Sequence, residues 1–85
     1  MKVVYSKDFI KSTKILGSAQ KLRLVQRIEL LLTDPRNPQL RNHKLSGRWS
    51  GYSSINITGD LRAVFEQSNG EIYFIALGSH AKLYK

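Results

Sequence analysis

The chain has 85 residues and carries 14 Lys and Arg against six Asp and Glu, a formal net charge of +8. Its hydrophobic fraction of 41% is typical of a globular protein, and its length suits one small domain, residues 1–85. The absence of cysteine excludes disulfides and thiolate metal sites. We expect no signal peptide and no membrane segment, because the longest unbroken apolar stretch covers only residues 72–77.

The N-terminal residues predict a strand followed by a helix. Residues 2–5 are rich in Val and Tyr, as strands commonly are. Ser6 can cap a helix that runs to Leu16, and Gly17 is a natural stop for it. The chain is therefore expected to leave a strand and enter a helix without a long loop.

A second helix is predicted from Ala19 to Thr33, with Ser18 as its cap. It ends at Asp34, because a residue before proline avoids the helical conformation. Its apolar residues recur at helical spacing and predict one buried stripe. The stripe residues are Leu24, Val25, Ile28, Leu31 and Leu32. The short turn between the two helices predicts that they are antiparallel.

The second half of the chain predicts a sheet. Residues 36–48 form a polar, irregular connection in which Leu40 and Leu45 can anchor to the core. Beyond it apolar and polar residues alternate, which predicts three strands over residues 52–57, 61–66 and 72–77. The predicted fold class is α+β: an N-terminal strand, two antiparallel helices, then a three-stranded antiparallel sheet with the first strand added at an edge.

The turn at residues 69–70, Asn-Gly, is a strong signal for a two-residue hairpin, since both positions need positive φ. Such a turn pairs Phe65 with Phe74, and Ala63 with Ala76. These pairs would place one apolar set on the face covered by the helices.

The turn before it is predicted as a three-residue loop, residues 58–60. This loop places Asn56 opposite Arg62, on the face away from the helices. A slip of one residue would bury Arg62, so the hydrophobic pattern specifies this register.

The positive charge favours a polyanionic partner: RNA, DNA or an acidic protein. The basic residues are dispersed from Lys2 to Lys85, which indicates a folded surface with a positive face and not a basic tail. A basic protein without a nucleic-acid role is the alternative reading of the same composition.

Arg62, His80 and Tyr84 are candidates for chemistry on a phosphate. The planar guanidinium of a strand Arg suits bidentate phosphate binding, although a solvated outward Arg fits the pattern as well. An imidazole suits general acid–base catalysis near neutral pH, and a phenol among cations can also take up a proton. His43, Lys44 and Arg48 enter the same sheet and could add a second proton-transfer group and positive charge, or be plain surface charge.

Three segments carry a resemblance to a known family. They are HKLSGRWSGY at residues 43–52, GDLRAVF at residues 59–65 and GSHAKLY at residues 78–84. In their order and spacing they resemble the RelE/ParE superfamily of bacterial toxins, most closely its YafQ-like and RelE-like ribonuclease branches. The resemblance spans essentially the whole chain and implies the RelE-like fold, with the active site on the concave face of the sheet.

Matching positions imply roles for individual residues. His43, Asp60 and His80 match catalytic residues of YafQ-like enzymes, Tyr84 matches their terminal aromatic residue, and Arg62 matches the phosphate-binding strand Arg of RelE proper. Asn56 stands where YafQ-like enzymes carry another His, so the choice of acid and base among His43, His80 and Tyr84 stays open. The residues expected to contact RNA are Asn56, Arg62, Lys44, Arg48 and Lys82.

The resemblance implies the toxin of a type II toxin–antitoxin pair, an endoribonuclease that cleaves mRNA on the ribosome. Attack by the ribose 2′-OH would leave a 2′,3′-cyclic phosphate. It also implies a bacterial, cytoplasmic protein that binds a cognate antitoxin, as one toxin monomer within a hetero-oligomer. A ParE-like inhibitor of DNA gyrase and a non-catalytic RNA-binding module are the alternatives. No cofactor or metal is expected, because the two histidines and scattered acids lack metal-ligand spacing.

Overall fold

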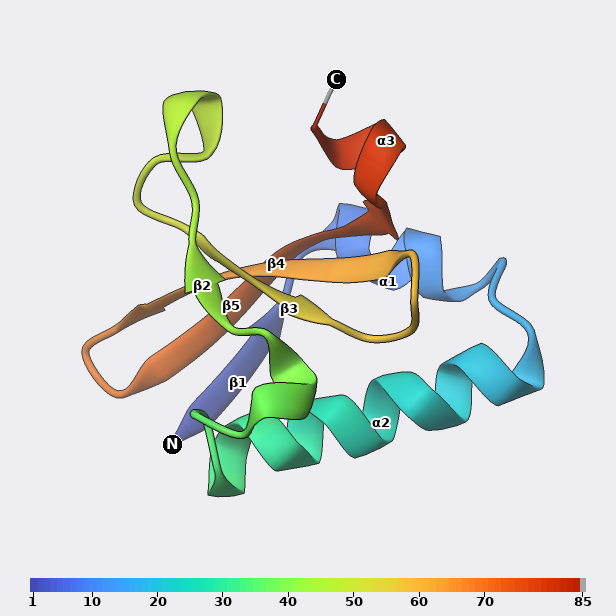
Figure 1. The fold of residues 1–85 in the computed structure, drawn as a ribbon, viewed down its shortest axis with the longest axis horizontal. Coiled ribbons are helices and arrows are strands. Elements are labelled where there is room, and N and C mark those ends of the chain that lie inside the picture. Colours follow the sequence, from blue (N-terminus) through green and yellow to red (C-terminus); the bar gives the residue numbers. More distant parts are fainter. Residues whose placement is uncertain (85) are drawn as a thin grey trace.

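A computed structural model describes residues 1–84 as an α+β fold built on one five-stranded sheet with strand order β1-β5-β4-β3-β2. Helices α1 and α2 supply Phe9, Leu24 and Leu31 to the core on one side of this sheet, and α3 lies across the sheet from α2 (Figure 1). The elements are β1 (Lys2–Tyr5), α1 (Lys7–Thr13), α2 (Ser18–Thr33), η1 (Pro38–Leu40), β2 (His43–Lys44), η2 (Gly47–Trp49), β3 (Ser53–Asn56), β4 (Leu61–Ser68), β5 (Glu71–Ser79) and α3 (His80–Leu83). No helix within residues 1–84 is long and apolar enough to cross a membrane.

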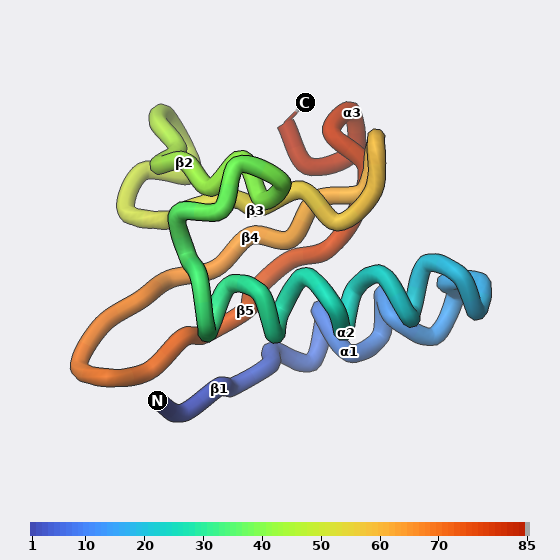
Figure 2. The backbone as a smooth tube through the Cα atoms, turned by 60° about the horizontal axis from the view of Figure 1, so that its bottom comes forward, coloured from blue at the N-terminus to red at the C-terminus, as the bar shows by residue number. Residues whose placement is uncertain are grey.

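The predicted start of the chain is confirmed. Strand β1 lies at the edge of the sheet, parallel to β5. The Ser6 hydroxyl accepts a hydrogen bond from the Phe9 N–H (3.0 Å) and so caps α1. Helix α1 ends at Thr13, one turn before the predicted end at Leu16, and α2 then runs back in the opposite direction (Figure 2).

Helix α2 differs from the prediction in its cap and in its buried face. Gly17, not Ser18, is the N-cap residue, and its N–H is satisfied by the side chain of Gln20 (3.1 Å). Only Leu24 and Leu31 of the predicted stripe are fully buried, and Ile28 packs against the core from its edge. Val25 and Leu32 are 53% and 41% exposed. The helix therefore buries a narrower stripe than its sequence pattern predicts.

The two hairpins confirm most of the predicted register. Asn69 and Gly70 both have positive φ, and Phe65 pairs with Phe74. In the other hairpin Asn56 pairs with Arg62. The loop between them covers residues 58–60 and is closed by a hydrogen bond from the Ile57 N–H to the Leu61 carbonyl (2.8 Å).

One predicted pair is wrong. Ala63 pairs with Leu77, and Val64 with Ala76, because a bulge shifts the register between Val64 and Phe65. The extra residue on β5 is Ile75, whose carbonyl accepts a hydrogen bond from the Ser6 hydroxyl (2.9 Å). The bulge turns Leu77, instead of Ala76, toward the helices.

The core lies between the sheet and the helices. Its centre is Phe74, whose ring lies 5.3 Å from Phe9, 5.6 Å from Phe65 and 5.6 Å from Tyr5. Leu40 is fully buried in the same cluster, as predicted, and fastens the connection after α2 to the core. Burial raises the pKa of the Tyr5 phenol at the margin of this cluster.

Besides the 3-10 helices η1 and η2, the strand β2 and the helix α3 were not predicted. The connection contains β2, which extends the sheet beyond β3, so the sheet has one strand more than expected. After β5 the chain forms α3, in which the Ser79 hydroxyl accepts a hydrogen bond from the Lys82 N–H (3.1 Å). Both short elements lie next to the sheet face that the core leaves free.

Candidate active site

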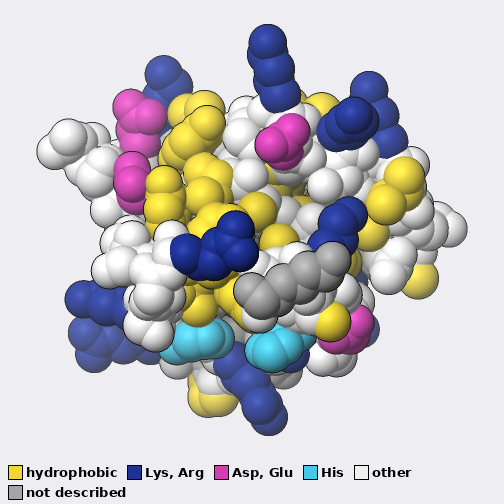
Figure 3. All heavy atoms as spheres, turned by 90° about the horizontal axis from the view of Figure 1, so that it is seen from above, with side chains coloured by type: hydrophobic (Ala, Val, Ile, Leu, Met, Phe, Trp, Pro, Cys, Tyr) yellow, Lys and Arg dark blue, Asp and Glu magenta, His cyan; other side chains and the backbone are white. Residues whose placement is uncertain are grey.

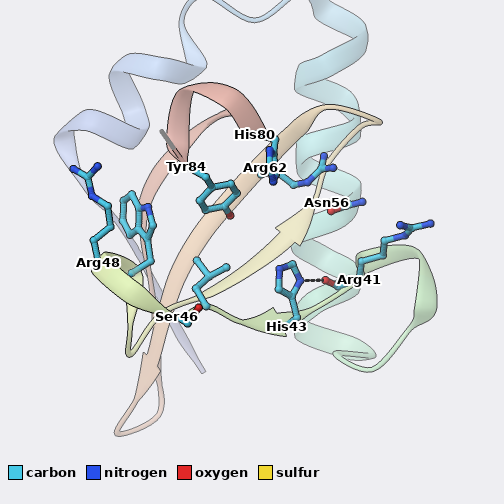
Figure 4. A pocket seen from close by; sticks show the side chains of 10 residues that line it. Arg41, His43, Ser46, Arg48, Asn56, Arg62, His80 and Tyr84 are labelled. Carbon is cyan, nitrogen blue, oxygen red and sulfur yellow. Dashed lines mark hydrogen bonds between the residues drawn. The ribbon is translucent and has the colours of Figure 1, made fainter.

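A cavity of about 590 Å³ is lined by residues of β2, η2 and α3 and by Asn56 and Arg62 on the sheet face away from the core. Its walls combine histidines, arginines and aromatic rings, as Figure 4 shows. The lining residues are Arg41, His43, Leu45, Ser46, Arg48, Trp49, Asn56, Arg62, His80 and Tyr84. Four of the five residues predicted to be catalytic thus meet in one place: His43, Arg62, His80 and Tyr84.

Arg62 and Asn56 reach the cavity because they are a cross-strand pair on β4 and β3. Alternation along β4 sends Ala63 and Phe65 into the core and Arg62 to the opposite face. The register prediction for Arg62 is therefore confirmed.

The Arg62 guanidinium is held at one end. Its Nη1 donates to the carbonyl oxygens of Thr58 (3.2 Å) and Gly59 (3.0 Å) in the β3–β4 loop. A guanidinium has five N–H donors, so Nε and Nη2 keep three for a ligand. The loop thus orients Arg62 and leaves its fork for an anion such as phosphate.

Helix α3 carries His80 and Tyr84. The His80 N–H donates to the Asp60 carbonyl (3.3 Å), which attaches the helix to the β3–β4 loop. The two rings meet edge to face, with centroids 4.8 Å apart. The Tyr84 hydroxyl is buried and has no hydrogen-bond partner within residues 1–84. Tyr84 therefore meets His80 through its ring, and its hydroxyl is covered.

His43 has a defined tautomer. Its Nδ1 lies 2.7 Å from the Arg41 carbonyl oxygen, which can only accept a hydrogen bond, so Nδ1 carries the proton. In the neutral ring Nε2 is then the nitrogen that can take up a proton. The Arg41 carbonyl thus fixes which ring nitrogen of His43 is the acceptor.

Trp49 connects the two short elements that enclose the cavity. Its indole N–H donates to the Leu83 carbonyl at 2.9 Å, although the two residues are 34 positions apart. The ring also contacts Tyr52 edge to face, with centroids 5.9 Å apart. This bond fixes η2 against the end of α3, next to Tyr84.

Of the other predicted residues, only some line this cavity. Arg48 lines the cavity with the residues above. Lys44 lines a neighbouring cavity and not this one. Asp60 and Lys82 are exposed and line neither cavity, although the Asp60 backbone holds His80.

Sequence reasoning missed Arg41 and a role for Trp49. Arg41 lines the cavity beside His43, but it lies outside the motif at residues 43–52. Trp49 belongs to the motif at residues 43–52, but only the fold shows that it contacts the C-terminal helix.

The cavity is cationic. Its described lining includes Arg41, Arg48 and Arg62 together with two histidines, and no Asp or Glu. Both histidines are visible on one face, with Lys and Arg side chains near them (Figure 3). Residues 1–84 contain no cluster of His, Cys, Asp and Glu that could hold a metal ion. The arrangement suits binding of an anion and proton transfer by imidazole.

Comparisons with known proteins identify the family and the fold. The model of the family "Bacterial toxin of type II toxin-antitoxin system, YafQ" matches residues 1–85. The fold is similar to crystal structures of YafQ from E. coli strain BL21(DE3) (TM-score 0.82, 24% identity, 99% of this chain and 98% of that one) and of the E. coli DinJ–YafQ toxin–antitoxin complex (TM-score 0.80, 26% identity, 99% and 97%).

The fold is also similar to that of the RelB–RelE antitoxin–toxin complex from Methanococcus jannaschii (TM-score 0.74, 22% identity, 95% of this chain and 94% of that one). A search of curated proteins finds no match. Because the family model covers the whole chain, the chain belongs to the YafQ family of toxins of type II toxin–antitoxin systems.

Proposed function

We propose that this toxin is a metal-independent endoribonuclease that cleaves mRNA on the ribosome. The observation that carries the proposal is the meeting of His43, Arg62 and His80 around one cationic cavity. Cleavage of RNA by its own 2′-OH needs a base, an acid and a group that stabilises charge on the phosphate. The cavity offers one residue of each kind.

His43 is the proposed base. Its Nδ1 proton is committed to the Arg41 carbonyl, so Nε2 can remove the proton of the 2′-OH. Tyr84, the other candidate, has a buried hydroxyl that RNA cannot reach in this arrangement. The 2′ oxygen then attacks the adjacent phosphorus, and the bond to the 5′ oxygen of the next nucleotide breaks.

His80 is the proposed acid. It would give a proton to the departing 5′ oxygen, which leaves a 5′-OH end and a 2′,3′-cyclic phosphate. Tyr84 positions His80 through the edge-to-face contact of the two rings. Each proton transfer of this kind typically contributes about 10²- to 10⁴-fold to the rate.

Arg62 is the proposed phosphate ligand. Its guanidinium is oriented by the carbonyl oxygens of Thr58 and Gly59, so little reorganisation is needed when charge develops on the phosphate. Arg48 and Asn56 line the same cavity and can contact the neighbouring sugar and phosphate groups. Placement of the mRNA by the ribosome would supply the orientation that so small an enzyme lacks.

A cognate antitoxin is the proposed regulator. The related E. coli YafQ and M. jannaschii RelE occur in complexes with the antitoxins DinJ and RelB. A chain with a net charge of +8 would attract an acidic antitoxin segment. Such a segment could cover the Arg62 face or displace the four-residue helix α3.

The test is to map mRNA 5′ ends after brief expression of the wild type and of His80→Gln. Lys14→Gln, an exposed change on the helix side, serves as the control. We expect new 5′-OH ends with the wild type and the control, and few with His80→Gln. Growth arrest without cleavage would favour a gyrase inhibitor. RNA binding without either effect would indicate a non-catalytic module.

A further inference from the structure

A second cationic cavity adjoins the candidate active site. It has a volume of about 500 Å³. Its walls are the connection between α2 and β2 and residues of β2, β3 and β4. Arg36 and Lys44 line it, and neither residue lines the first cavity. Its described lining contains no Asp or Glu. The charge that suits an anion in the first cavity therefore continues into the second.

The two cavities share two residues, Arg41 and His43. The proposed base thus stands at the junction of the cavities. An RNA chain whose scissile phosphate lies beside His43 could continue past Arg41 into the second cavity. Lys44 would meet it there, since it lines the second cavity and not the first.

The backbone at the junction is unusual. Arg41 has φ 47° and ψ 45°, in the left-handed region, at the C-terminus of η1. Helix ends in this conformation usually carry Gly or Asn, which adopt it with less strain. Here an Arg is kept, which places a cation between the cavities. Such a strained residue is a reason to look for function.

The wall of the second cavity is preformed. The Arg41 N–H donates to the Pro38 carbonyl (3.2 Å), and the Asn42 side chain donates to the Pro35 carbonyl (3.2 Å). Leu40, between them, is fully buried. These contacts hold the backbone that carries Arg36 and Arg41.

We propose that the second cavity binds the sugar–phosphate backbone of the single-stranded RNA that flanks the cleaved nucleotide, through Arg36, Arg41 and Lys44. The proposal rests on the proposed function, since the same RNA strand fills both cavities. Contacts of this kind carry no base specificity; they set the register of the strand. They also make binding depend on salt, with a slope of about 0.7 per phosphate contact on a logarithmic scale.

The test compares two double variants that lose the same charge. Arg36→Gln with Lys44→Gln alters only the second cavity, and Lys7→Gln with Lys14→Gln alters exposed residues on the helix side. Binding of a 2′-O-methyl RNA of about a dozen nucleotides, which cannot be cleaved, is measured over a range of salt. We expect the first variant to bind more weakly, with a salt slope smaller by about 1.4, and the second to resemble the wild type.

A 2′-O-methyl dinucleotide, titrated by NMR, adds a second comparison. It can fill the first cavity but is too short to reach both, so the Arg36 and Lys44 changes should leave its binding unaltered. Equal binding of the long RNA by both double variants would overturn the proposal, as would equal weakening of dinucleotide and long RNA. The assay needs no cleavage. If the Arg36 and Lys44 double variant binds the long RNA normally and cuts mRNA normally, only this site is refuted. If it binds the long RNA more weakly with a smaller salt slope, but the wild type cuts no mRNA, only the proposed reaction is refuted.

Discussion

One face of the sheet in this toxin packs the core, and the other lines the candidate active site. Strand β4 contributes residues to both. On the helix-covered face, Ala63 and Phe65 are almost completely buried among apolar side chains. On the other face, Arg62 lines a polar cavity and is held by loop carbonyls. Burial of apolar surface determines the first face, and hydrogen bonds to the backbone of short loops determine the second.

This difference between the faces predicts whether a substitution changes stability or the rate of cleavage. A truncation on the covered face leaves a cavity in the core, so it should lower the stability of the fold. A chain of this length buries little apolar surface, so the loss is a large share of its stability. A change in the open cavity removes little buried surface, so it should lower the rate of cleavage and leave the fold intact. The following substitutions test this division, from the largest expected effect to the smallest.

Phe74→Ala should give the largest loss of stability. Phe74 is fully buried and lies at the centre of the aromatic cluster. Truncation of a buried Phe costs about 3–5 kcal/mol, a large share of the stability of a small domain. Thermal unfolding followed by circular dichroism measures the effect, and Phe74→Leu should lose clearly less. An unchanged melting temperature in Phe74→Ala would invert the assignment of the two faces.

His43→Asn should lower cleavage by about 10²- to 10⁴-fold with little change in melting temperature. The Asn amide can replace Nδ1 as the donor to the Arg41 carbonyl, but it offers no group in place of the basic Nε2. Single-turnover cleavage of ribosome-bound mRNA measures the effect. A variant that cleaves at the normal rate would exclude His43 as the base.

Trp49→Phe should loosen α3. The change removes the 2.9 Å hydrogen bond to the Leu83 carbonyl, a contribution of about 1 kcal/mol, and keeps an aromatic ring beside Tyr52. Faster hydrogen exchange of the Tyr84 N–H, which is bonded to the His80 carbonyl, should report the loosening. Tyr52→Phe is the matched control and should leave this exchange unchanged. Identical exchange in Trp49→Phe would show that the indole bond does not hold the helix.

Tyr84→Phe should have the smallest effect. The hydroxyl is buried and has no partner among the described residues 1–84, so its removal should stabilise the fold slightly, by less than about 1 kcal/mol. Cleavage should persist, because the ring contact with His80 remains. Tyr84→Ala, which removes that contact, should lose most of the activity. Loss of activity in Tyr84→Phe would instead assign chemistry to the hydroxyl.

The sequence predicts the covered face well because hydrophobic alternation and turn residues act locally. The Asn69–Gly70 turn and the pairs Phe65–Phe74 and Asn56–Arg62 follow from these signals. The bulge at Ile75 does not, because it depends on Ser6, 69 residues away in the chain. Strand β2 escapes prediction for a similar reason, since its two residues form a strand only through pairing with β3.

The motifs predict which four candidate residues meet on the open face. They do not predict the contacts that orient these residues. Lys44, which is expected from the sequence to contact RNA together with Arg62, lines the other cavity instead. The bonds from His43 to the Arg41 carbonyl and from Trp49 to the Leu83 carbonyl involve backbone atoms, which carry no sequence signal. The stripe on α2 was predicted too wide because periodicity shows which side of a helix is apolar, not how much of that side is covered.

The most direct test of the open face as a centre of RNA cleavage is to replace one oxygen of the substrate. An mRNA with a 2′-deoxyribose at the mapped cleavage position is presented on the ribosome to the wild-type toxin, beside the unmodified mRNA and one modified at the next nucleotide. We expect cleavage of both comparison RNAs and none of the deoxy-substituted one, because His43 then has no 2′-OH to activate. Cleavage of the deoxy-substituted position at the normal rate would contradict this expectation.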